Sequence, residues 1–301
     1  MILIVDNNPI LERRLMGESF PKGGTGEAVE STTSATGYGV DMARLAGDMN
    51  EGARLLTFLG GFAGEQYGKF LSQSGIVLES ESLRDETQER IILEEKNKTT
   101  TIYTREPRIT REDTVDFYER FVRESVASDV VVIAKGTRSK EPESMKLPMV
   151  RYARSKSKPV IILSDERDDV EEVREAKPFG MIIDRAALSQ LVDRNLQFLG
   201  DIASTVAKLY GDDIPLILVT GSSKGSILYC KGEYFFAKND EINDYFDPHH
   251  AAVAMAAGIV RKYDAPTLLK LTAAAAQSEK TTDFATIKSD MNRINVQSME
   301  V

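Results

Sequence analysis

Short apolar runs that end at turns or polar residues constrain the fold of this chain more than any other feature. They occupy Met1–Val5, Leu55–Gly61, Asp129–Ala134, Pro159–Leu163, Gly180–Ile183 and Pro215–Thr220. Continuous apolar runs of this length are typical of parallel strands that are buried on both faces. Helical segments such as Arg111–Ser125 and Ala186–Leu199 are expected between them. This alternation predicts an α/β fold, with a mostly parallel central sheet covered by helices on both faces.

Composition fits one domain that spans residues 1–301 and limits its partners. The chain is 42% hydrophobic, 28% charged and carries a formal net charge of -9. An acidic chain lacks the basic footprint that nucleic acid requires and a polybasic arm for anionic membranes. The single cysteine, Cys230, rules out an internal disulfide and has no partner at a metal-ligand spacing, so we expect no metal site of protein ligands.

No apolar run approaches the ~20 residues of a membrane-spanning helix, and the opening residues lack the basic region of a signal peptide. We therefore expect a cytoplasmic protein. The acidic, polar tail from Gln277 is expected to be partly mobile.

Asp247 and Pro248 predict the start of a helix, because an aspartate accepts hydrogen bonds from first-turn amides and proline needs no partner there. The following residues, Ala251–Ala257, are small or apolar almost all round the helix. This pattern predicts a buried helix, and Gly258 allows an even closer approach of a neighbour.

The order of segments resembles the PfkB branch of the ribokinase-like sugar kinases, closest to the 1-phosphofructokinase and tagatose-6-phosphate kinase subgroup. The resemblance spans nearly the whole chain and includes the Asn8-Pro9 turn, the Gly37-x-Gly39 loop and the alanine-rich helix after His250. It implies a ribokinase-like three-layer α/β/α fold with a small β-sheet lid, from lid segments at about 15–34 and 77–104. It also implies phosphoryl transfer from Mg-ATP to a sugar hydroxyl.

The substrate side of the family's site maps onto Asn8, Glu12, Gly37, Gly39, Asp41 and Arg90. Glu12 stands where the family has an aspartate that binds sugar hydroxyls. Tyr38 and Asp41 replace a lysine and an asparagine of the family's glycine-rich signature. Arg90 is two positions from the family's phosphate-clamping arginine, which in a strand leaves it on the same face. We expect these residues to bind substrate.

The nucleotide side maps onto Thr220, Ser222, Lys224 and Gly225, in a turn between two expected strands. Such a turn could bind an anion or serve as an ordinary hairpin. Near Asp184, the family's magnesium-linked glutamate is replaced by Ala187, which supplies no oxygen ligand.

The largest departure lies at 247–250, where the family has Gly-Ala-Gly-Asp and this chain has Asp-Pro-His-His. An anion site at a helix start needs free amides, whereas Pro248 has none and Asp247 adds negative charge. His250, at the position of the family's catalytic base, could accept a proton near neutral pH; Asp247 is the other candidate. The alternative is that both histidines are exposed or satisfied side chains.

Two functions remain open from the sequence. The first is a catalytically impaired pseudokinase that binds a sugar, a sugar phosphate or a protein partner. The second is an active, diverged sugar or sugar-phosphate kinase that uses Mg-ATP. Because lids of this family can pair between subunits, we also expect a homodimer through the lid.

Overall fold

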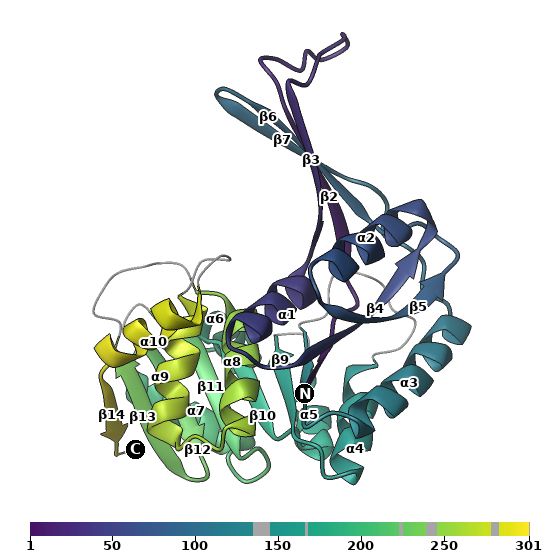
Figure 1. Cartoon of the computed structure of the whole chain (residues 1–301). Coiled ribbons are helices and arrows are strands. Elements are labelled where there is room, and N and C mark those ends of the chain that lie inside the picture. The colour runs from purple at the N-terminus through teal and green to yellow at the C-terminus, as the bar shows by residue number, and fades with distance from the viewer. Residues whose placement is uncertain (135–144, 166–167, 223–224, 239–245, 278–282, 301) are drawn as a thin grey trace.

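The computed structural model describes residues 1–134, 145–165, 168–222, 225–238, 246–277 and 283–300. Two sheets organise these residues: a large sheet in the body of the molecule and a small one that projects from it (Figure 1). No helix within those ranges is both long enough and apolar enough to cross a bilayer.

The large sheet is mostly parallel, as the apolar runs predict. Its order is β14-β13-β12-β11-β10-β9-β8-β1-β4-β5. The parallel part consists of β1 Ile2–Val5, β4 Ala53–Gly60, β5 Val77–Leu83, β8 Val130–Ile133, β9 Val160–Ser164, β10 Gly180–Asp184 and β11 Leu216–Ser222. An antiparallel part follows at one edge, with β12 Gly225–Cys230, β13 Glu233–Lys238 and β14 Val296–Met299.

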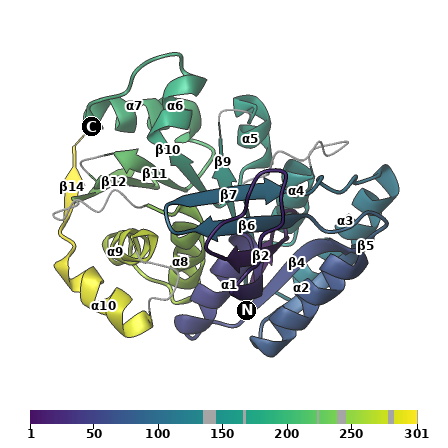
Figure 2. The same ribbon diagram turned by 90° about the horizontal axis from the view of Figure 1, so that it is seen from above.

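Helices cover both faces of this sheet (Figure 2). One face carries α1 Tyr38–Asp48, α2 Gly61–Gln73, α8 Pro248–Val260, α9 Ala265–Ala276 and α10 Phe284–Arg293. The other carries α3 Arg111–Val126, α4 Lys146–Ser155, α5 Val170–Ala176, α6 Arg185–Leu191 and α7 Leu199–Tyr210. Successive strand residues supply the two cores alternately, so that Ile2 and Ile4 face one and Leu3 and Val5 the other.

The small sheet is the lid, in the order β3-β2-β6-β7. Its strands are β2 Ile10–Met16, β3 Glu30–Thr36, β6 Glu89–Glu95 and β7 Lys98–Tyr103. The expected lid segments were wrong in part, because the lid begins at Ile10 and β5 belongs to the large sheet, parallel to β4. The polar residues of β5 are typical of a solvent-exposed lid strand. They are tolerated in the large sheet because β5 is its edge strand.

One further expectation was wrong. The helix expected over Ala186–Leu199 is α6, which ends at Leu191; Asp193 then adopts a left-handed backbone conformation, and the next helix, α7, begins only at Leu199. The polar tail contains α10 and β14, and β14 extends the large sheet by pairing with β13. Burial of Ile287 against the core anchors α10 despite its polar composition.

Helix α8 is the buried helix that its small residues predict. Every residue from His249 to Gly258 is buried. A side chain at Gly258 would place its Cβ 2.3 Å from Leu268 Cδ1 of α9, so glycine is what permits this close approach. The start of α8 is tied to the end of α9 by a hydrogen bond from the Asp247 amide to the Ala276 carbonyl, 2.8 Å long.

Candidate functional site

Asp6 joins the turn after β1 to the start of α1. Its Oδ2 accepts a 2.6 Å hydrogen bond from the Gly39 amide, and its Oδ1 accepts a 3.0 Å bond from the Asn8 amide. Burial raises the pKa of the Asp6 carboxyl above its usual range, although both amides oppose the shift. Two segments that the sequence assigns to substrate binding, at Asn8 and Gly37–Gly39, are therefore held together by one buried carboxyl.

The local structure requires glycine at two positions, directly before α1 and in its first turn. Gly37 has φ of 125°, a backbone conformation that residues with a Cβ rarely adopt. A Cβ at Gly39 would lie 2.5 Å from Leu55 Cδ1 and 2.7 Å from Asp6 Cβ. Both glycines thus let α1 begin directly over Asp6, and their predicted role in substrate binding stays a prediction.

Tyr38, at the family's lysine position, connects the starts of α1 and α8. Its ring stacks on the His249 imidazole with centroids 3.6 Å apart and an interplanar angle of 8°. Tyr38 remains 44% exposed. The stack therefore places an uncharged ring beside the first turn of α8. The resemblance implies a lysine at this position, whose positive charge would bind a phosphate.

Asp247 caps helix α8, as the sequence predicts. Its Oδ1 accepts hydrogen bonds from the amides of His249, at 2.8 Å, and His250, at 3.4 Å. Burial alone would raise the pKa of the Asp247 carboxyl, but the His249 side-chain hydrogen bond and the charges of both histidines hold that pKa below its usual range. The positive end of α8 therefore faces a fixed carboxylate of its own chain.

The two histidines are not exposed. His249 is 3% and His250 2% accessible, and Nδ1 of His249 lies 3.3 Å from Asp247 Oδ1. Within the described ranges, Nε2 of His249 and Nδ1 of His250 have no hydrogen-bond partner. The expectation that these side chains are exposed or satisfied is therefore wrong, because each histidine is buried and has a ring nitrogen without a described partner.

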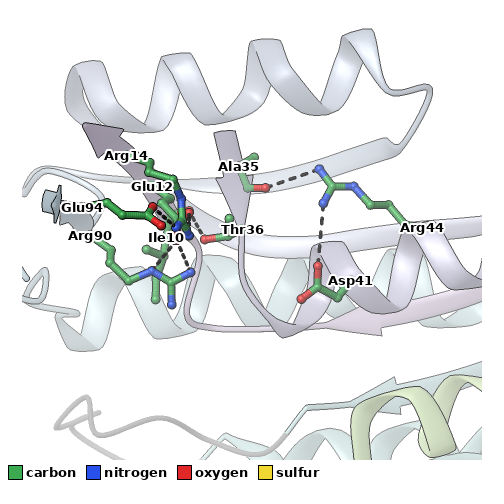
Figure 3. Close-up of polar contacts among 9 residues, drawn as sticks. All are labelled: Ile10, Glu12, Arg14, Ala35, Thr36, Asp41, Arg44, Arg90 and Glu94. Atoms are coloured by element: carbon green, nitrogen blue, oxygen red, sulfur yellow. Dashed lines mark hydrogen bonds and ion pairs between the residues drawn. The ribbon is translucent and has the colours of Figure 1, made fainter. Parts of the chain in front are cut away.

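The lid places Glu12 opposite Arg90 on the adjacent parallel strands β2 and β6. Arg90 Nε donates a 2.7 Å hydrogen bond to Glu12 Oε2, and Arg14 joins Glu12 to Glu94 (Figure 3). The Arg90 guanidinium is therefore ion-paired with Glu12, so that one predicted substrate residue binds another. Their role in substrate binding stays a prediction.

Asp41 lies in the first turn of α1, with Oδ1 3.7 Å from Arg44 Nη1. Arg44 also donates to the Ala35 carbonyl of β3 at 3.4 Å, which ties α1 to the lid (Figure 3). Asp41 and Asp6 both raise the pKa of the buried Tyr67 phenol, after the larger effect of burial. These interactions place Asp41 in the same acidic region as Asp6.

The predicted nucleotide side lies at the ends of β10 and β11. Thr220 is buried and pairs in register with Asp184, which caps α6 by accepting a 2.7 Å hydrogen bond from the Ala187 amide. Gly225 has φ of 138°, and a Cβ there would meet the Ala237 carbonyl oxygen at 1.9 Å. Lys224 and the Ser222 side chain lie outside the described residues, so their predicted role stays a prediction.

Asp6, Tyr38 and His249 were not among the predicted site residues. Asp6 had a usable signal, since it directly follows the first buried strand and opens the Asp6–Pro9 turn. The contact between Tyr38 and His249 had none, because only the folded chain brings α1 beside α8.

The first turn of α8 has its amides in use. The His249 and His250 amides donate to the Asp247 carboxylate, and Pro248 has no amide to donate to an anion. In the described ranges, no group of three histidine, cysteine, aspartate or glutamate side chains could hold a metal ion.

Comparison with known proteins places this geometry in context. No protein-family model matches the chain. The 1-phosphofructokinase of Bacillus subtilis is 23% identical over 237 residues, which is 79% of this chain and 77% of the relative. A Staphylococcus aureus protein provisionally named a phosphofructokinase superposes with a TM-score of 0.88 at 17% identity, covering 100% of this chain and 99% of its own. The chain has the ribokinase-like fold of the PfkB carbohydrate kinases.

The PfkB resemblance inferred from the motifs is thereby confirmed. Phosphofructokinase-2 of Escherichia coli, in complex with fructose-6-phosphate, superposes with a TM-score of 0.79 at 10% identity and covers 97% of this chain and 98% of its own. Two of the departures from the family's pattern, at Tyr38 and at residues 247–250, lie at the starts of α1 and α8, which meet in the Tyr38–His249 stack.

Proposed function

We propose that this chain is a PfkB-type, carbohydrate-kinase-like binding protein in which phosphoryl transfer by the family's route is impaired. The observation that carries the proposal is the cap on α8, where Asp247 accepts hydrogen bonds from the amides of His249 and His250. Its ligand is a sugar, a sugar phosphate or a protein partner.

Electrostatics supports this proposal. Phosphoryl transfer depends mainly on positioning and on stabilising negative charge in the transition state. Here the start of α8 presents a carboxylate, Tyr38 replaces a lysine, and Arg90 is paired with Glu12. A phosphate at this place would compete with Asp247 for the same amides and would be repelled by its charge.

The proposal is tested by calorimetric titration with ATP and magnesium, together with an ADP-release assay over hexoses and hexose phosphates. We expect no turnover above a blank without protein. Binding of a sugar or nucleotide without turnover would also agree with the proposal, whereas sustained ADP release on any sugar would refute it.

Motif restoration provides a sharper test. The variant Asp247→Gly/Pro248→Ala/His249→Gly/His250→Asp writes the family's motif into α8 and removes the cap. His250→Asp alone is the matched control, because it supplies a base and leaves Asp247 on the amides. If the cap is what impairs transfer, the single change produces no activity; turnover from that single change would contradict the proposal.

Active phosphoryl transfer is the second candidate function, and the relatives favour it. The similar Bacillus subtilis protein is a 1-phosphofructokinase, and the similar Escherichia coli structure holds fructose-6-phosphate. In this chain, the buried Nδ1 of His250 has no described partner, and the motif alignment places His250 where the family has its catalytic base. On this hypothesis Mg-ATP is the phosphoryl donor, a sugar or sugar phosphate is the acceptor and His250 is the base. Loss of turnover in His250→Ala but not in His249→Ala would support it.

We further propose a homodimer through the lid. Apolar side chains that are exposed on the lid and its loop support this pairing: Met16, Val29, Ile102 and Tyr103. Light scattering at micromolar concentration should give twice the chain mass of 33.4 kDa, and Ile102→Glu should give the single-chain mass. A single-chain mass for the unmodified protein would refute this assembly.

A further inference from the structure

A basic cavity opens where β9, β10 and β11 begin. Its volume is about 350 Å³, and its charged lining consists of Arg154, Lys158, Lys177 and Asp213. These strands run in the same direction as β1, which leads to the lid (Figure 1). The cavity therefore lies at the edge of the sheet away from the candidate site, by about the length of a strand, roughly 15 Å.

Three prolines form a rigid part of the wall. Pro159 and Pro215 directly precede β9 and β11, and Pro178 lies two residues before the start of β10. Hydrogen bonds of 2.9 Å from the Val131 and Lys231 amides fix the carbonyls of Pro159 and Pro215. The proline rings and the half-buried Phe179 give the cavity an apolar surface that is already in place.

Positive charge exceeds negative charge in the lining. The Arg154 side chain has no hydrogen bond or ion pair with any residue of the described ranges. Lys158 Nζ donates to a neutral acceptor, the Ser128 carbonyl, at 2.7 Å. Its charge also helps to lower the pKa of the Asp129 carboxyl, which pairs with the Met1 amino group at 2.7 Å outside the cavity lining. Three cationic side chains thus face one carboxylate, that of Asp213.

Asp213 is itself held by cations. Its Oδ1 lies 3.1 Å from Lys177 Nζ, and its Oδ2 accepts a 2.9 Å hydrogen bond from Arg174 Nε. Hydrogen bonds from Arg174 and Lys177 lower the pKa of this carboxyl, so it remains ionised at neutral pH. Within the described ranges and the cavity lining, neither Arg154 nor Lys158 forms an ion pair with a carboxylate, in a chain whose formal net charge is -9.

We propose that this cavity is a binding site for a small organic anion that carries two or more negative charges. Arg154 and Lys158 bind its charged groups, and Phe179 with the proline rings contacts its carbon skeleton. Charge-assisted hydrogen bonds from arginine and lysine suit phosphate esters and polycarboxylates alike, and the cavity volume is in the range of small-molecule sites.

The test is calorimetric titration of the full chain with citrate and, separately, with glycerol 3-phosphate. Binding of citrate alone identifies a polycarboxylate site, and binding of glycerol 3-phosphate alone a phosphate-ester site. Arg154→Gln and Lys158→Gln should each weaken the observed binding about tenfold, the usual effect of losing one charge-assisted hydrogen bond. Arg151→Gln is the matched control, because Arg151 lies on the same helix but pairs with Glu175 outside the cavity.

Asp213→Asn should change anion affinity in the opposite direction. Removing this carboxylate eliminates the negative charge in the lining and releases Lys177, so anion affinity should rise severalfold. A merely structural role for Asp213 would leave affinity equal or lower. The proposal is overturned by absence of binding at millimolar anion, by equal loss in Arg151→Gln, or by equal or weaker binding in Asp213→Asn.

Discussion

Replacing Asp247 measures the cap that the proposed function depends on. Its side chain accepts two backbone hydrogen bonds, and the 2.8 Å bond from the His249 amide is the strong one. Loss of a helix cap costs about 1 kcal/mol, and leaving a buried amide without its charged acceptor raises the cost to about 2–3 kcal/mol. We therefore expect Asp247→Ala to lower the free energy of unfolding by about 2–3 kcal/mol at pH 7. Asp247→Asn, which keeps a capping oxygen, should lose about 1 kcal/mol.

The effect of Asp247→Asn must depend on pH. The carboxyl pKa is lower in the folded protein than its ordinary value, which is about 3.9 for an unfolded aspartate. The charge therefore stabilises the fold fully above about pH 4, and this stabilisation is lost as pH falls toward the lower, folded-state pKa. The difference between the unmodified protein and the asparagine variant should therefore shrink as pH falls below about 4.

Urea unfolding followed by circular dichroism at pH 7, 5 and 3.5 checks this prediction. Asp264→Asn is the matched control, because Asp264 caps α9 through a 2.9 Å bond from the Thr267 amide but lies at the surface. Its effect should be smaller at every pH. Equal stability of Asp247→Asn and the unmodified protein at pH 7 would refute an ionised, stabilising cap, as would a difference that persists undiminished at pH 3.5.

Three shorter predictions follow from the same region. Tyr38→Ala should lower the unfolding free energy by about 1 kcal/mol more than Tyr38→Phe, because phenylalanine keeps the ring that stacks on His249; equal losses in urea unfolding would exclude the stack. A double-mutant cycle with Glu12→Gln and Arg90→Gln should give a favourable coupling of about 1 kcal/mol, and additive effects would mean that the pair is absent in solution. Gly39→Ala should destabilise by about 1–3 kcal/mol because its Cβ meets neighbouring atoms. Gly47→Ala, on the same helix with nothing nearby, should stabilise by up to about 1 kcal/mol, and the reverse order of melting temperatures would contradict the packing.

The central fold could be predicted because its signals are local. Each parallel strand inside the large sheet is apolar on both faces and is therefore a continuous run, such as Val130–Ile133, whereas the edge strand β5 is not. The start of α8 was also predictable, since a cap and a proline act within one turn. Sheet membership was harder: β5 looks solvated, and only its pairing with β4 reveals that it belongs to the body.

The sequence could predict several residues of the candidate site, but not which side chains they contact. The sequence places Glu12 and Arg90 in the substrate region, yet their mutual ion pair depends on the register of two strands that are distant in the chain. The same holds for the stack between Tyr38 and His249. A motif alignment considers each residue separately. In the folded chain these residues contact one another, and the alignment does not predict such contacts.

The parallel pairing of β2 with β6 has a consequence for the order of folding. Unlike a hairpin, this pair cannot form from neighbouring residues, because α1, β4, α2 and β5 intervene between its strands. Closing so long a loop is entropically costly until the intervening elements have collapsed onto the sheet. The alignment of Glu12 with Arg90 is therefore a late event, and amide hydrogen exchange in the lid will report whether the N-terminal half of the body is intact.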